Sequence, residues 1–125
     1  MAELVYRAYR DEDEGGVIEL WRRCGLIRPW NHPQADIRRK CADSRQLFFV
    51  GERDGTPVAS CMAGYDGHRG WIYYLAVAPE LRRQGIAARL VSIAEAELRR
   101  LGCPKIDLMI RDTNQQVIAF YRALG

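Results

Sequence analysis

Residues 77–87, VAPELRRQGIA, are the most informative segment for the fold, because they join an apolar strand to an amphipathic helix. Ahead of it, residues 72–77 are apolar on both faces, which is typical of a central strand covered by helices on each side. Pro79 ends that strand. Behind it, apolar residues keep helical spacing from residue 85 to 101, and Gly102 is expected to cap the helix. The stretch is therefore a strand, a loop and a helix in direct succession.

The loop and the start of this helix predict a binding site for a diphosphate group. A helix N-terminus carries unpaired N–H groups and a partial positive charge. Gly85 and Ala87 leave room for a phosphate to approach, and Arg82 and Arg83 can add charge-assisted hydrogen bonds. The spacing differs from that of a P-loop and from that of a Rossmann fingerprint. A diphosphate cofactor of another kind is therefore expected.

The remaining elements predict one mixed α/β domain over residues 1–125. Strands are expected at residues 4–9, 47–53, 58–65, 71–78 and 105–110, and helices near residues 17–24, 34–42 and 117–124. Asp54 and Gly55 tolerate positive φ and so predict a hairpin. A helix lies between the strands at 71–78 and 105–110, which makes that pair parallel.

Composition excludes several classes of function. The apolar runs are too short to cross a bilayer and the N-terminus lacks a signal-peptide pattern, so we expect a cytoplasmic protein without a membrane partner. The net charge of +3 is spread over several elements, which argues against nucleic acid as a partner. The four cysteines show no metal-ligand spacing, so buried free thiols are expected and no metal.

The loop Arg82-Arg83-Gln84-Gly85-Ile86-Ala87 after a central strand resembles the hallmark of the GNAT superfamily of N-acetyltransferases. The resemblance covers nearly the whole chain, including Asn114 and the ending FYRALG at residues 120–125. It implies an α/β fold with a mixed, mainly antiparallel twisted sheet flanked by helices. In this fold, strands four and five form a splayed parallel pair.

The resemblance also implies that acetyl-CoA is the co-substrate. Strand four would present backbone groups to the thioester and the pantetheine arm, and the loop would hold the pyrophosphate. The residues expected to contact the cofactor are Leu75, Ala76, Val77, Arg82, Arg83, Gln84, Gly85, Ile86, Ala87 and Asn114.

The implied reaction is direct attack by a primary amine of a small molecule or a protein on the acetyl carbonyl. The Val77 N–H is expected to polarise that carbonyl, and Tyr121 to protonate the departing thiolate. Alternatively, Tyr121 is a core aromatic on the helical face of Val117 and Leu124. Where many family members carry a catalytic Glu, this chain has Trp71 and Met109. The general base is therefore open, with Asp66, His68, Glu52 or a water chain as candidates.

Two segments are expected to flank the acceptor, the loop at residues 25–31 and the turn at residues 66–69. The residues expected to contact the acceptor are Arg28, Trp30, Asn31, Asp66 and His68. Trp30 could stack on the acceptor, or it could pack the loop onto the domain.

Two further alternatives concern the whole chain. Since the catalytic Glu is missing, a coenzyme A binding sensor or interaction module with weak catalysis is the rival to an enzyme. The sequence also stops at Gly125, where family members usually add two more strands. We therefore expect either part of a longer protein or a domain completed by self-association into a homo-oligomer.

Overall fold

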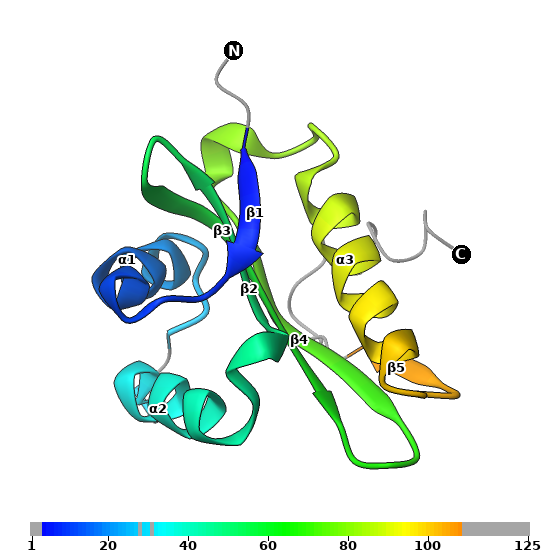
Figure 1. Cartoon of the computed structure of the whole chain (residues 1–125). Helices are drawn as coiled ribbons and strands as arrows, with labels where there is room; N and C mark the ends of the chain where they lie inside the picture. The colour runs from blue at the N-terminus through cyan, green and yellow to red at the C-terminus, as the bar shows by residue number, and fades with distance from the viewer. Residues whose placement is uncertain (1–3, 28, 31, 109–125) are drawn as a thin grey trace.

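A computed structural model describes residues 4–27, 29–30 and 32–108 of the chain (Figure 1). Five strands form one sheet in chain order: β1 (Val5–Ala8), β2 (Phe48–Arg53), β3 (Thr56–Tyr65), β4 (Gly70–Val77) and β5 (Ile106–Leu108). Neighbouring strands are antiparallel except β4 and β5, which are parallel. This confirms the expected mixed, mainly antiparallel sheet with a parallel pair at its end.

Helices cover both faces of the sheet. On one face lie α1 (Glu14–Arg23) and α2 (Pro33–Ser44), and on the other lies α3 (Ile86–Arg100) (Figure 1). Three short 3-10 turns complete the described elements: η1 (Asp11–Asp13), η2 (Arg45–Leu47) and η3 (Pro79–Leu81). The expected helix at residues 117–124 lies outside the described residues.

The periodic apolar faces of these helices form the core. Leu20 and Trp21 of α1 are buried against the sheet, and so are Leu90 and Leu98 of α3. Burying one such side chain stabilises the fold by about 1.5–3 kcal/mol. Two of the four thiols, those of Cys61 and Cys103, are also buried, whereas Cys24 and Cys41 are only half-buried. The expectation of four buried thiols is therefore wrong for those two.

The close packing of α3 on β4 decides which end of the helix meets which end of the strand. A Cβ on Gly70, at the start of β4, would lie 2.7 Å from the sulfur of Cys103 and 2.9 Å from Leu98 Cδ1. The C-terminal end of α3 thus packs on the first residue of β4. Since the helix runs antiparallel to the strand, its N-terminus points toward the end of β4 at Val77.

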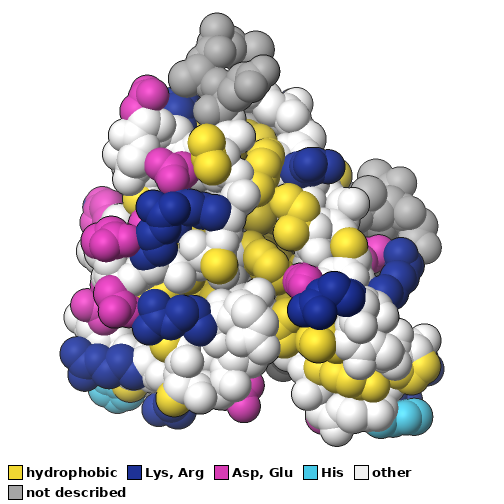
Figure 2. Space-filling view, viewed as in Figure 1, with side chains coloured by type: hydrophobic (Ala, Val, Ile, Leu, Met, Phe, Trp, Pro, Cys, Tyr) yellow, Lys and Arg dark blue, Asp and Glu magenta, His cyan; other side chains and the backbone are white. Residues whose placement is uncertain are grey.

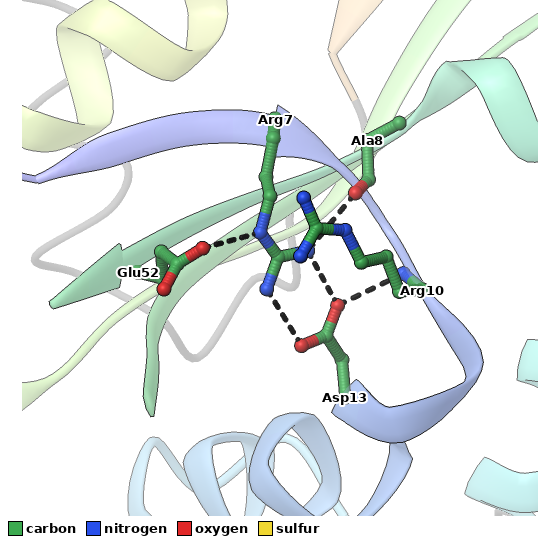
Figure 3. Close-up of polar contacts among 5 residues, drawn as sticks. All are labelled: Arg7, Ala8, Arg10, Asp13 and Glu52. Atoms are coloured by element: carbon green, nitrogen blue, oxygen red, sulfur yellow. Dashed lines mark hydrogen bonds and ion pairs between the residues drawn. The ribbon is translucent and has the colours of Figure 1, made fainter. Parts of the chain in front are cut away.

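A nearly buried ion-pair cluster holds the opposite edge of the sheet (Figure 3). Arg7 of β1 donates two hydrogen bonds to the carboxylate of Asp13, at 2.7 and 2.8 Å, and one to Glu52 Oε1 at 2.5 Å. The N–H of Arg10 adds a bond of 2.8 Å to Asp13 Oδ2. The cluster joins β1, β2 and the turn that precedes α1.

Candidate active site

The backbone at the end of β4 is directed toward the side where β5 lies. Ala78 N donates to Val58 O at 2.8 Å, and alternate residues of a strand point their backbone groups to opposite sides. Val77 therefore directs its N–H and C=O away from β3. The described part of β5 pairs only with Gly70, Ile72 and the residue between them. The expected splay beyond that point lies outside the described residues.

A β-bulge interrupts β4 just before this end. Along β3 the register advances two residues from Ser60 to Met62, while along β4 it advances three, between Ala76 and Tyr73. The extra residue of β4 is accommodated at Tyr74, whose φ is +50°, a conformation that a residue with a bulky side chain rarely adopts. Bulges re-aim the groups that follow them, and here these are the backbone groups of residues 75–77.

The loop after β4 leaves open space at the start of α3. Arg83 and Gly85 have φ of +65° and +79°. The first helical hydrogen bond runs from Arg89 N to Gly85 O at 3.0 Å, so three preceding N–H groups, those of Ile86, Ala87 and Ala88, have no helical acceptor. A Cβ on Gly85 would have no atom within 4 Å. This is room in which an anionic group can reach the helix N-terminus.

Two side chains meet the carbonyl oxygen of Val77. Cys24 Sγ, at the end of α1, and Arg82 Nε each donate to it at 3.3 Å. The side chains of Arg83 and Gln84 are exposed, whereas those of Ala76 and Ile86 are buried. The two buried residues can therefore meet a ligand only through their backbone.

The described residues expected around the acceptor, Trp30, Asp66 and His68, lie in two separate loops. Trp30, in the loop that follows Cys24, is 72% exposed, so it does not pack the loop onto the domain. Asp66 and His68 lie in the turn that precedes β4, at the end opposite Val77. Tyr65 O–H donates to Gly102 O at 3.2 Å and so joins this turn to the end of α3. Contact of Asp66 and His68 with the acceptor stays a prediction.

Two of the candidate bases, Asp66 and Glu52, are held in other interactions. Asp66 Oδ1 accepts hydrogen bonds from the N–H groups of Arg69 and His68, and these bonds lower the pKa of its carboxyl group. Glu52 lies on β2, two strands away from β4, and forms an ion pair with Arg7 of β1. Four further predicted site residues, Arg28, Asn31, Asn114 and Tyr121, lie outside the described residues.

Helix α2 carries a buried lysine. Lys40 of α2 is 5% exposed, and burial lowers the pKa of its ammonium group below the ordinary value. Its Nζ donates to Ser44 Oγ at 3.0 Å and to Ala63 O, and it lies 5.4 Å from the centre of the Tyr73 ring. These contacts join α2 to β3 and give Lys40 a structural role.

A separate apolar groove lies between β1 and α3 (Figure 2). Tyr6, Ala8 and Phe49 line its sheet side, and Ile93 and Ala96 line its helix side. The groove adjoins the C-terminal half of α3, so it is distinct from the open surface at Gly85.

Among the described residues, no helix is long and apolar enough to cross a membrane. Within the same part of the chain, His, Cys, Asp and Glu form no cluster of three that could hold a metal ion.

Comparisons with known proteins agree with this geometry. The model of the acetyltransferase (GNAT) family matches residues 6–125. An acetyltransferase of Pectobacterium atrosepticum is 51% identical over 118 residues, which span 94% of this chain and 84% of that protein.

Solved structures share the fold at lower identity. The NatC complex bound to a Gag peptide and CoA contains a chain with a TM-score of 0.82 at 24% identity, covering 98% of this chain and 84% of that one. An aminoglycoside acetyltransferase from a soil metagenome has a TM-score of 0.74 at 19% identity, covering 96% and 86%.

Proposed function

Because the chain belongs to the acetyltransferase (GNAT) family and is an acetyl-CoA dependent enzyme, we propose that it acetylates a primary amine by direct attack of that amine. The acceptor is a small molecule or the N-terminus or a lysine of a protein. The observation that carries the proposal is the open N-terminus of α3, at Gly85, beside the end of β4. We place this activity in one domain over residues 1–125.

The described residues fit acetyl-CoA. The N–H groups of Ile86, Ala87 and Ala88 and the exposed side chains of Arg83 and Gln84 offer hydrogen bonds to the pyrophosphate. Leu75, Ala76 and Val77 would present backbone groups to the thioester and the pantetheine arm. A splay of β4 from β5 beyond Ile72 would let that arm enter, and Asn114 would add a contact.

We assign a residue to each catalytic role except that of the general base, which takes the proton from the amine. The acetyl group moves to the amine nitrogen as the C–S bond breaks, and the sulfur takes up a proton. The Val77 N–H polarises the carbonyl, because a backbone donor fixed by a strand needs no reorganisation. Tyr121 supplies the proton to the sulfur.

The neighbours leave both acceptor classes open. The NatC structure holds a peptide, and the soil enzyme is named for aminoglycosides. On this chain, exposed Trp30 lies in the loop that follows Cys24, whose thiol contacts Val77, so we expect an acceptor of either class to contact Trp30.

An amine panel tests the proposal. The purified protein is incubated with acetyl-CoA and peptides with a free N-terminus, N-terminally blocked peptides with one lysine, or neamine, and free coenzyme A is measured by chromatography. We expect amine-dependent release of coenzyme A for one class. Calorimetric binding of coenzyme A without release for any amine would support the sensor module instead.

A further inference from the structure

The left-handed backbone of Tyr74 is held by three separate contacts. Its carbonyl oxygen accepts a hydrogen bond of 3.2 Å from Ser60 Oγ. Its ring stacks on that of Trp21, with centroids 4.1 Å apart and planes 14° apart. Its hydroxyl donates to Asp36 Oδ2 at 2.8 Å. The three partners come from β3, α1 and α2.

Ser60 is a polar residue in an apolar part of β3, and its hydroxyl makes two hydrogen bonds, one with Trp21 and one with Tyr74. It is fully buried on β3 between the apolar residues Ala59 and Cys61. A buried hydroxyl destabilises the fold unless it is hydrogen-bonded. Here it accepts a bond of 2.8 Å from Trp21 Nε1 and donates its own proton to the Tyr74 carbonyl. The hydrogen bond from Trp21 therefore orients the Ser60 hydroxyl so that its proton points at the Tyr74 carbonyl oxygen.

We propose that Ser60 and Asp36 are positioning residues that hold Tyr74 in its left-handed conformation and thereby aim the backbone of residues 75–77 at the thioester. Without these contacts, an aromatic residue with a Cβ favours an extended backbone, and the bulge would relax or shift. The inference rests on the proposed function of β4. It adds that helices α1 and α2, which flank the loop expected at the acceptor, also maintain the geometry of the acetyl-CoA site.

A double-mutant cycle between Ser60 and Tyr74 tests the positioning role. Ser60→Ala is expected to lower kcat about tenfold or more, with the Kd of coenzyme A changed by less than about threefold. Glycine adopts positive φ without help, so Ser60→Ala added to Tyr74→Gly should lower kcat by less than about twofold. An equal tenfold loss in both backgrounds would overturn the proposal. If Tyr74→Gly does not fold, Tyr74→Asn replaces it, since asparagine also tolerates positive φ.

The Asp36 contact is tested in the same way. Tyr74→Phe and Asp36→Ala each remove one partner of the hydrogen bond, so the double variant should lose no more kcat than the stronger single variant. Additive losses would show that Asp36 acts on something other than Tyr74.

Cys61→Ala is the matched control for packing. Cys61 is the next residue on β3, is fully buried and loses one heavy atom, as Ser60 does, but it makes no hydrogen bond to β4. It should lower the midpoint of thermal unfolding without lowering kcat. A loss of kcat equal to that of Ser60→Ala would reduce the role of Ser60 to packing.

A readout that needs no turnover separates this inference from the proposed function. Backbone ¹³C chemical shifts of Tyr74 and Leu75 should move toward extended values in Ser60→Ala and remain unchanged in Cys61→Ala. If wild type binds no coenzyme A but the shifts move, the proposed function fails and the role of Ser60 at Tyr74 stands. If wild type is active and the shifts do not move, only the positioning role fails.

Discussion

The thiol of Cys24 donates a hydrogen bond to the carbonyl oxygen of Val77 at 3.3 Å, so the last turn of α1 contacts the end of β4. Arg82 Nε donates to the same oxygen. A half-buried thiol thus lies at the strand that we assign to the pantetheine arm, whereas Cys61 and Cys103 are buried.

Alkylation of Cys24 should therefore impair coenzyme A binding. N-ethylmaleimide adds bulk at the Val77 carbonyl, so binding measured by calorimetry should fall in step with modification measured by mass spectrometry. Bound coenzyme A should slow the modification. Cys24→Ser keeps a donor and should resist inactivation, and inactivation of that variant at the wild-type rate would assign the effect to Cys41.

Gly85→Ala should weaken coenzyme A binding about tenfold or more, since its methyl group enters the open space at the helix N-terminus. Gly102→Ala is its matched control, because Gly102 lies at the other end of α3 with φ of +90° and equally open surroundings. Both variants should lose about 1–2 kcal/mol of stability from the left-handed backbone. Equal coenzyme A affinity in the two folded variants would count against the pyrophosphate site.

The Arg7 cluster should make stability depend on pH. Burial by itself would raise the pKa of Asp13, but hydrogen bonds from Arg7 and from the Arg10 N–H outweigh it and hold that pKa below its ordinary value. A carboxylate with a lowered folded pKa stabilises the fold fully above its unfolded pKa of about 3.9. The contribution is lost as pH falls through the folded pKa.

Asp13→Asn should accordingly lower the free energy of unfolding by about 3 kcal/mol at neutral pH, as when a buried ion pair loses one partner. The gap between variant and wild type should narrow below about pH 4, as measured by urea unfolding. Glu19→Gln breaks only an exposed pair with Arg22 and should show no gap at either pH. A constant gap for Asp13→Asn would mean that its effect is not electrostatic.

Trp30→Ala should raise the KM for the acceptor and leave the unfolding midpoint unchanged, because the indole is exposed and supports no packing. The KM for acetyl-CoA is the internal control and should not move. A lowered unfolding midpoint with an unchanged acceptor KM would restore the packing interpretation.

Tyr121→Phe should lower kcat about 100-fold or more while coenzyme A affinity stays within about threefold, as expected for loss of a general acid. The loss should be larger for an acetyl thioester whose thiol is a poorer leaving group, because departure of that thiolate depends more on protonation. Wild-type turnover would make Tyr121 a core aromatic.

The elements could be predicted from the sequence because their signals are local. Helical spacing in residues 85–101 and the Asp54-Gly55 turn predicted α3 and the hairpin, and both turn residues have positive φ. The loop at Gly85 could be interpreted as an anion site for the same reason, since one glycine at a helix start carries the signal.

The contacts around β4 could not be predicted, because they join residues distant in sequence. Tyr74 is 38 residues from Asp36 and 14 from Ser60. Nothing in the run Ile72–Val77 indicates which residue leaves the extended conformation, since the partners that hold Tyr74 come from three other elements. The ion pair of Arg7 with Glu52 also joins residues distant in sequence, so the sequence alone leaves Glu52 among the candidate bases.

Two residues that flank the loop between α1 and α2 contact β4: Cys24, directly after α1, contacts Val77, and Asp36, in the first turn of α2, contacts Tyr74. The residues that make these two contacts lie outside the loop, so substitutions within the loop can leave both contacts in place. If the loop borders the acceptor as proposed, the acceptor can change by substitution there while β4 keeps its supports.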